Sequence, residues 1–334
     1  MVIEARGSGS WADEWAFFRE IEGWSAAGRH RDVLDALERL PGELREGRTR
    51  SALLAAEANG RLGNYGEAAR WAELAGTLAR TRGEAHGELR ARNYRGAIAL
   101  RHGDVSDAED HFSAALEMAR TLNDHTAEAR ALNNLGILAN IRGDAETALA
   151  HYRRALVAYQ HDGLVRGMAE TYHNIGISLR HQGNVQGALG AAEEAVRLAA
   201  QAGDEQLIAL ASTGRAEIHV MLGDPAFARA ELFRAEERYN RIGFRAGLPE
   251  VWRVRAGVAF ATRDAGTAVS LLTQAAALAT ELGSTDILAD IERDLSYALE
   301  STGDVAGATS ARARAMALYR KLGAVPAAER LKRV

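Results

Sequence analysis

Apolar side chains recur at intervals of three and four residues along most of this chain. Ala148, Tyr152, Ala155 and Tyr159, for example, fall on one face of an α-helix. The segment from Ala131 to Ile141 has the same spacing and ends shortly before that helix begins. The pattern therefore predicts amphipathic helices separated by short turns.

The helical pattern repeats every forty residues. A Gly-Asp or Gly-Asn dipeptide marks each period, and at Arg263-Asp264 only the Asp remains; the glycines are Gly63, Gly103, Gly143, Gly183, Gly223 and Gly303. Alanine follows each mark after five residues and again after twelve, from Ala68 and Ala75 to Ala308 and Ala315, without exception. Twenty residues after the mark stands Gly, or Asn123 in one repeat.

These columns predict two antiparallel helices in each repeat. Gly and Asn adopt the left-handed conformation that ends a helix, and Asp or Asn caps the helix that follows. The alanine columns indicate that helices approach closely there. A further column of small residues indicates the same on the first helix of each repeat: Ala56, Gly96, Gly136, Gly176, Ala216, Ala256 and Ser296.

The repeat resembles the tetratricopeptide repeat in its longer, forty-residue variety. The resemblance is carried by Leu132, Leu135, Gly136, Gly143, Ala148, Tyr152 and Ala155, and by their equivalents over residues 49–322. It implies an all-α, right-handed superhelical solenoid whose concave wall is lined by the first helix of each pair. Three arginines depart from the family at a normally apolar position: Arg95, Arg215 and Arg255. Either they pair with buried acids, or those repeats pack less regularly.

The flanking segments complete the predicted organisation. Residues 1–10 are expected to form a flexible tail, and residues 11–48 a degenerate helix pair that carries Trp11, Trp15 and Phe18. The aromatic residues fit a cap on the repeat core, and alternatively a partner or homo-oligomer contact. Residues 323–334 are expected to form a capping helix, so that about eight pairs and this helix make up the solenoid.

Composition excludes several classes of protein. The net charge of -4 gives no reason to expect a nucleic-acid partner. The chain contains no Cys, which excludes disulfides and thiolate metal sites. Without a long apolar stretch or an apolar signal segment, we expect a cytoplasmic protein that does not enter a membrane.

Catalysis is not expected. The ten His residues offer the only candidates for a metal or catalytic site, and His173 and His181 stand too far apart for the usual i, i+4 metal pair. No phosphate-binding loop or dinucleotide motif is present. We therefore predict no enzyme, cofactor or metal.

The predicted concave wall differs between its two halves. Its first half is rich in Asn and basic residues: Arg50, Arg90, Asn93, Arg130, Asn133, Asn134, Asn140, His173, Asn174 and Arg180. Asn offers a donor and an acceptor to a peptide backbone, and Arg binds carboxylates. The second half carries Glu217, Glu250, Asp290 and Asp294 beside Arg253 and Arg293.

We therefore predict a peptide-binding module that holds an acidic or carboxylate-bearing segment of a protein or peptide partner along the first half. The alternative for these side chains is an ordinary solvated face, or Asn bonding between neighbouring repeats. The alternative function is a ligand-responsive regulator similar to the bacterial peptide-pheromone receptors, in which the occupied groove controls a second partner.

Overall fold

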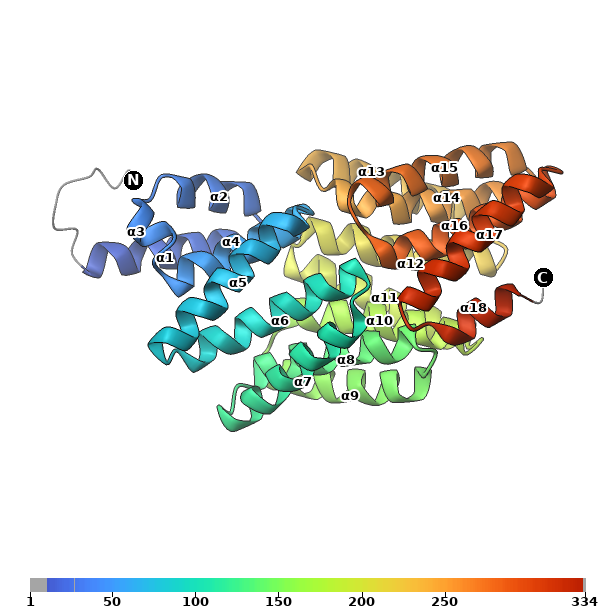
Figure 1. Cartoon of the computed structure of the whole chain (residues 1–334). Coiled ribbons are helices and arrows are strands. Elements are labelled where there is room, and N and C mark those ends of the chain that lie inside the picture. Colours follow the sequence, from blue (N-terminus) through green and yellow to red (C-terminus); the bar gives the residue numbers. More distant parts are fainter. Residues whose placement is uncertain (1–10, 27, 333–334) are drawn as a thin grey trace.

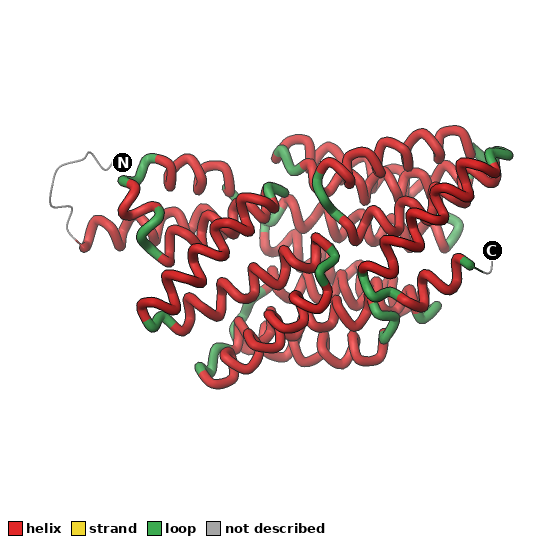
Figure 2. The backbone as a smooth tube through the Cα atoms, in the orientation of Figure 1, coloured by secondary structure: helices red, strands yellow, loops and turns green. Residues whose placement is uncertain are grey.

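The computed structural model describes residues 11–26 and 28–332, and the regular secondary structure of these residues is entirely helical. Figure 2 shows helices joined by short loops throughout. The expected tail, residues 1–10, lies outside the described residues, as do the last two residues of the expected capping segment.

The seven predicted repeats form seven consecutive antiparallel helix pairs, which confirms the expected solenoid. The first helices are α4 (Thr49–Leu62), α6 (Ala85–His102), α8 (His125–Ile141), α10 (Val165–His181), α12 (Glu205–Met221), α14 (Leu248–Ala261) and α16 (Thr285–Ser301). The second helices are α5 (Tyr65–Arg82), α7 (Val105–Thr121), α9 (Ala145–His161), α11 (Val185–Ala202), α13 (Pro225–Ile242), α15 (Ala265–Glu281) and α17 (Val305–Lys321). The flanks are α1 (Trp11–Ala26), α2 (His30–Glu38), α3 (Gly42–Arg45) and α18 (Val325–Leu331), and the 3-10 turn η1 (Arg245–Gly247) precedes α14.

The helices end where the repeat columns predicted. Asn123 and Arg263, which replace glycine in those columns, have positive φ angles of 53° and 62°. Arg263 therefore adopts the conformation of its column despite its Cβ. Five of the seven second helices are capped by the predicted side chain, which accepts an N–H three residues further on: Asp144, Asn184, Asp224, Asp264 and Asp304.

The two helices of a pair approach closely at the small residues. A Cβ at Gly136 would lie 2.4 Å from the ring of Tyr152, and one at Gly96 would lie 2.6 Å from the ring of Phe112. Tyr152 and Phe112 are fully buried. The small residues of the first helix thus leave room for the aromatic side chain of the second helix.

The three unusual arginines pair with acids. Arg95 lies 3.1 Å from Glu73 on α5, and Arg255 pairs with Glu236 on α13. Arg215 pairs with the buried Glu231. Of the two interpretations offered by the sequence, the pairing is the observed one, although only Glu231 is a buried acid.

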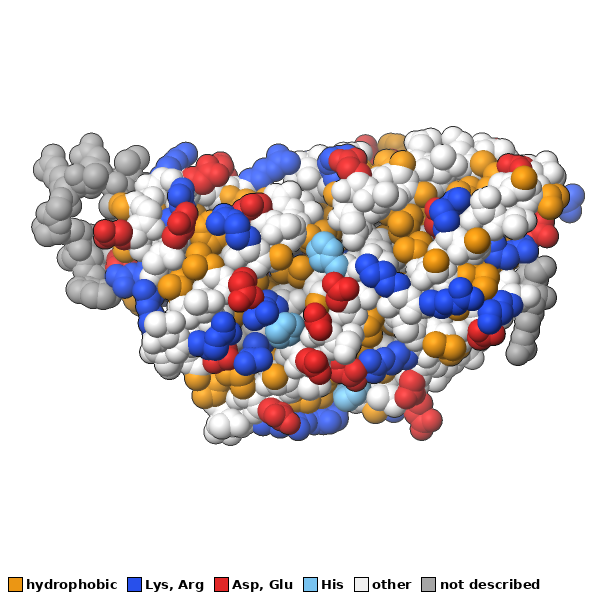
Figure 3. All heavy atoms as spheres, viewed as in Figure 1, with side chains coloured by type: hydrophobic (Ala, Val, Ile, Leu, Met, Phe, Trp, Pro, Cys, Tyr) orange, Lys and Arg blue, Asp and Glu red, His pale blue; other side chains and the backbone are white. Residues whose placement is uncertain are grey.

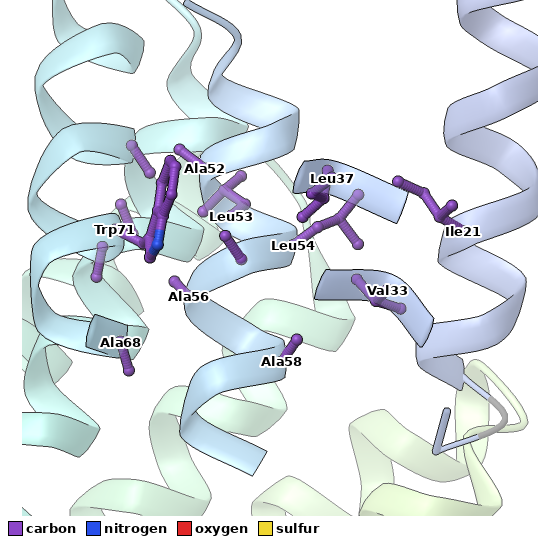
Figure 4. Packing of buried hydrophobic residues seen from close by; sticks show 14 of the residues in the cluster. Ile21, Val33, Leu37, Ala52, Leu53, Leu54, Ala56, Ala58, Ala68 and Trp71 are labelled. Carbon is purple, nitrogen blue, oxygen red and sulfur yellow. The ribbon is translucent and has the colours of Figure 1, made fainter. Parts of the chain in front are cut away.

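Helices α1 and α2 pack against the first repeat. Figure 4 shows Ile21, Val33 and Leu37 directed toward Leu54 of α4, while Trp71 of α5 lies on the other side of that helix. Trp15 is 57% exposed. The side chain of Trp11 is outside the described residues. The roles of a cap and of a partner contact remain predictions.

The superhelix is wound so tightly that successive turns touch. Three turns between the first and second helix of a repeat contact elements more than four repeats further along the chain. A Cβ at Gly63, Gly103 and Gly143 would lie 3.0 to 3.2 Å from Ala246, Thr285 and Pro326, respectively. In Figure 1, α6 accordingly lies beside the carboxyl-terminal helices, and it contacts α16. We call these contacts the seam.

Polar contacts also join the two sides of the seam. Arg101 of α6 lies 2.7 Å from Asp286 of α16. The carbonyl of His102 accepts hydrogen bonds from Thr285 and from Lys321, which is 219 positions away. None of the described helices is both long and apolar enough to cross a bilayer.

Candidate functional site

The first helices form the inner face of the superhelix. Each of them contacts the first helix of the next pair, from α4 through α16, whereas second helices of neighbouring pairs make no comparable contact in the described part of the chain. Arg61 of α4 even reaches Glu170 of α10, at 3.3 Å. The side chains that project from the first helices therefore face a narrow interior.

The predicted groove residues all lie on first helices, but several are engaged within the protein. Arg50 makes two hydrogen bonds of 2.6 Å to Glu22 of α1 and lies over the ring of Phe18. It stabilises the amino-terminal helices. His173 packs against Gly214 of the next first helix, and burial lowers the pKa of its imidazole to about 4, so the ring is neutral at pH 7.

Several asparagines join neighbouring repeats. Asn174 donates a hydrogen bond of 3.2 Å to the side-chain oxygen of Asn133, which is buried. Asn140 accepts one of 3.1 Å from Ser178. These are bonds of the kind that the alternative interpretation expected. Asn93 is buried, and its side-chain oxygen has no hydrogen-bond partner among the described residues.

Seven charged side chains form an amino-terminal cluster on the inner face. It contains four guanidinium groups and three carboxylates: Glu57, Arg61, Arg90, Arg130, Arg166, Glu170 and Asp204. Burial raises the pKa of Glu57 and of Glu170, but nearby Arg61 and other arginines outweigh it and hold both below their usual range. Glu57 and Glu170 are therefore ionised at pH 7.

Arg130 carries the excess positive charge of the amino-terminal cluster. It is exposed, and it makes no ion pair or hydrogen bond with another described residue, although its charge acts on Glu57 and Glu170. The neighbouring His30 does not change this balance, because burial and then Arg61 lower its pKa to about 4.

A carboxyl-terminal cluster lies further along the inner face and has the opposite balance. It contains three guanidinium groups and four carboxylates: Arg180, Glu217, Glu250, Arg253, Asp290, Arg293 and Asp294. Arg253, which is 6% exposed, contacts Glu217 at 2.6 Å, Glu250 at 2.8 Å and Asp294 at 3.1 Å. Although burial raises the pKa of Glu217, Arg180 and Arg253 bring it down to about 2.

A cavity of about 410 Å³ opens beside the carboxyl-terminal cluster, between α10, α12, α14 and α16. Arg180, Glu217, Arg253, Arg293 and Asp294 line it together with apolar side chains. Three of the latter are exposed, namely Met221 (51%), Phe260 (38%) and Tyr297 (36%). The cavity thus combines ionised groups with an apolar rim.

The predicted groove residues share this cavity only at Arg180. The sequence carried no signal for the rest, because the column of Met221 holds apolar residues such as Ile141 as well as polar ones such as Arg61. On the face drawn in Figure 3, acidic and basic side chains are interspersed without a large area of one sign. No group of described side chains has the composition of a metal site.

The fold is an α-solenoid whose first helices line one inner face. Tetratricopeptide-repeat family profiles match residues 87–161 and 168–202. The chain is a tetratricopeptide-repeat protein. The search of curated proteins gave no match.

Several solved structures share the fold. A Rap protein complexed with competence and sporulation factor has a TM-score of 0.64 at 15% identity, over 95% of either chain. The Rap conjugation gene regulator of plasmid pLS20, in complex with the Phr* peptide, has a TM-score of 0.65 at 15% identity, over 85% of this chain and 74% of that one. NprR in complex with its cognate peptide NprX has a TM-score of 0.60 at 17% identity, over 90% and 87%.

Proposed function

We propose that this protein is a non-catalytic, ligand-responsive regulator that binds a short peptide on its inner face. The observation that carries the proposal is the cavity beside the carboxyl-terminal cluster. It offers charged groups for a peptide's own charges and an exposed apolar rim at Met221, Phe260 and Tyr297 for a side chain. The likeness to a plasmid regulator solved with Phr* and to NprR solved with NprX supports a ligand of this class.

The seam supports a response to the ligand. Each repeat of a solenoid contacts mainly its neighbours, so a small rotation between successive pairs accumulates along the superhelix. Contacts such as Arg101 to Asp286 exist only when that accumulated rotation brings distant repeats together. A ligand that alters the spacing of the first helices would therefore open or tighten the seam. A second partner could bind one of these two forms in preference to the other.

The second candidate function is an adaptor that holds an acidic segment of a larger protein. Arg130 favours it, because this exposed guanidinium has five donors and no partner among the described residues. An adaptor of this kind would bind without a change in superhelical pitch. Both functions use the inner face, and they differ in what binding does to the protein.

Small-angle scattering separates the two. Free peptides would first be recovered on the immobilised protein from a pool of short random sequences, and the radius of gyration would then be measured with and without a recovered peptide. A regulator changes its radius of gyration on saturation. An unchanged radius, with binding intact, would favour the adaptor, and failure to recover any free peptide would contradict the regulator.

Charge reversal tests the use of the inner face. Arg90→Glu combined with Arg130→Glu should abolish binding of the recovered peptide. The matched control is Arg197→Glu with Arg80→Glu, two exposed positions on second helices. Unchanged binding to the first double variant would exclude the predicted first half of the inner face as a binding surface.

A further inference from the structure

The two clusters differ in their unused hydrogen-bonding groups as well as in net charge. In the amino-terminal cluster, Arg130 is exposed and bonds to no other described residue. A guanidinium presents five N–H donors in a planar fork that fits a carboxylate. This end of the inner face therefore offers donors and an excess positive charge.

The carboxyl-terminal cluster offers acceptors. Arg253 divides its donors among three carboxylates, and Arg293 contacts Asp290 and Asp294, each at 2.8 Å. The donors are thus largely engaged, and the four carboxylates of the cluster exceed its three guanidinium groups by one negative charge. An ammonium group has three donors and no acceptor, so it matches this end of the face.

The cavity adds a requirement for an apolar side chain. Glu217 and Asp294 contribute carboxylates to its wall, and the exposed Met221, Phe260 and Tyr297 surround them. A ligand that carries an ammonium group next to an apolar side chain would satisfy both parts of the cavity. A free peptide amino terminus with an apolar first residue has this chemistry.

We propose that the peptide is bound in one direction, with its free α-carboxylate at Arg130 and its free α-ammonium group in the cavity at Glu217 and Asp294. This inference rests on the proposed function. It defines the ligand as a short peptide with both termini free, an apolar first residue and an extended backbone between the clusters. Asn134 and Asn174 lie on α8 and α10 along this path.

The separation of the clusters limits the length of the peptide. Arg130 is on α8, and the cavity lies at α12 and α14. The distance between them along the inner face is two to three helix spacings. At 8 to 10 Å per spacing this is about 16 to 30 Å. An extended chain covers about 3.3 to 3.6 Å per residue, so the peptide would have about five to nine residues.

The test combines modified peptides with matched variants. A peptide recovered by selection would be prepared with free termini, with an amidated carboxyl terminus and with an acetylated amino terminus. Each form would be titrated by calorimetry into the wild type, Arg130→Gln and Asp294→Asn. Arg245→Gln and Glu281→Gln are the control variants, because this exposed ion pair belongs to neither cluster and does not line the cavity.

The expected result is a pattern of paired losses. Amidation should weaken binding to the wild type about tenfold to a hundredfold, as loss of a charge-assisted hydrogen bond does, and should have little further effect on Arg130→Gln. Acetylation should weaken binding to the wild type similarly and should have little further effect on Asp294→Asn. The control variants should respond as the wild type does.

Three other outcomes would overturn the inference. If the peptide binds and neither modification matters, the inference fails while the proposed function stands. If amidation weakens binding to Arg130→Gln as much as to the wild type, the peptide carboxylate does not lie at Arg130 and the proposed direction is wrong. If no free peptide binds at all, the proposed function fails as well. Because the modifications are made on the peptide, an unstable variant does not obscure the wild-type result.

Discussion

Arg101 and Asp286 stand 185 positions apart in the sequence and lie 2.7 Å from each other across the seam. This ion pair joins the second repeat to the seventh, and it is possible only at the superhelical pitch seen in this structure. The neighbouring carbonyl of His102 accepts hydrogen bonds from Thr285 and Lys321, so the contact has several components.

Charge reversal at Arg101 should loosen the seam with little cost in stability. Partly exposed ion pairs contribute about 0 to 1 kcal/mol, whereas two like charges at this distance repel each other. We expect Arg101→Glu to increase the radius of gyration in small-angle scattering and to change the melting temperature only slightly. Arg197→Glu, whose partner Glu194 is on the same helix, should leave the radius unchanged. Equal radii for both variants would contradict a closed seam.

Glycine at position 136 should be necessary for pair packing. In Gly136→Ala the new Cβ would lie 2.4 Å from the ring of buried Tyr152, and overpacking of this kind costs about 1 to 3 kcal/mol. Chemical denaturation would measure the loss. Gly190→Ala in α11 is the control, because the new Cβ would have no neighbouring side chain or other helix within 4 Å. This variant should be more stable than the wild type by about 0.5 to 1 kcal/mol. A stabilised Gly136→Ala variant would contradict the close approach.

The two central asparagines should differ in their contribution to stability. Asn174→Ala leaves the buried side-chain oxygen of Asn133 without its donor, at a cost of about 1 to 3 kcal/mol. Asn134 makes no side-chain hydrogen bond with another described residue, so Asn134→Ala should change the free energy of unfolding by less than about 0.5 kcal/mol. If the two variants unfold alike, the bond between Asn174 and Asn133 does not stabilise the repeats.

Stability should fall as the pH decreases from about 6.5 to 4. The pKa of His30 and that of His173 are each lowered to about 4, chiefly by burial, from 6.5 in the unfolded chain. In this window the unfolded state binds more protons, so acid favours unfolding. His173→Gln should reduce the difference between the free energies of unfolding at pH 7 and pH 5. An unchanged difference would show that His173 does not contribute.

A second loss should follow at lower pH. The pKa of Glu217 is about 2 in the folded protein, against 4.5 in the unfolded chain, because Arg180 and Arg253 outweigh its burial. The stabilisation is present above the unfolded value and is lost as the pH falls through 4.5 toward 2. Glu217→Gln should flatten the stability curve over this range in denaturation experiments. If its curve runs parallel to that of the wild type, the carboxylate is not coupled to the arginines.

Much of the solenoid could be predicted from the sequence because its determinants are local. Glycine or a tolerated substitute such as Asn123 ends a helix by its own backbone preference, and Asp144 caps the helix that starts beside it. The small residue at Gly136 and the aromatic residue at Tyr152 are sixteen positions apart, within a single repeat. Contacts within one repeat leave their spacing in the sequence, and forty-residue periodicity makes that spacing visible.

The candidate site could be predicted only in part. The sequence placed Arg130 and Asn174 on the inner face and offered bonds between asparagines of neighbouring repeats as an alternative, which Asn174 and Asn133 form. It did not reveal that Arg50 turns toward Glu22. The cavity at Met221 and Phe260 lay beyond the half that the sequence favoured. Which side chains pair with one another depends on the distances between repeats, and the sequence of a single repeat column does not contain these distances.

The amino-acid sequence by itself thus determined the helices, their turns and their pairing, because these depend on backbone preferences and on packing within forty residues. The seam, the two charge clusters and the cavity were decided by the tertiary structure. They depend on the small rotation between successive pairs, which accumulates over several repeats before Arg101 can meet Asp286.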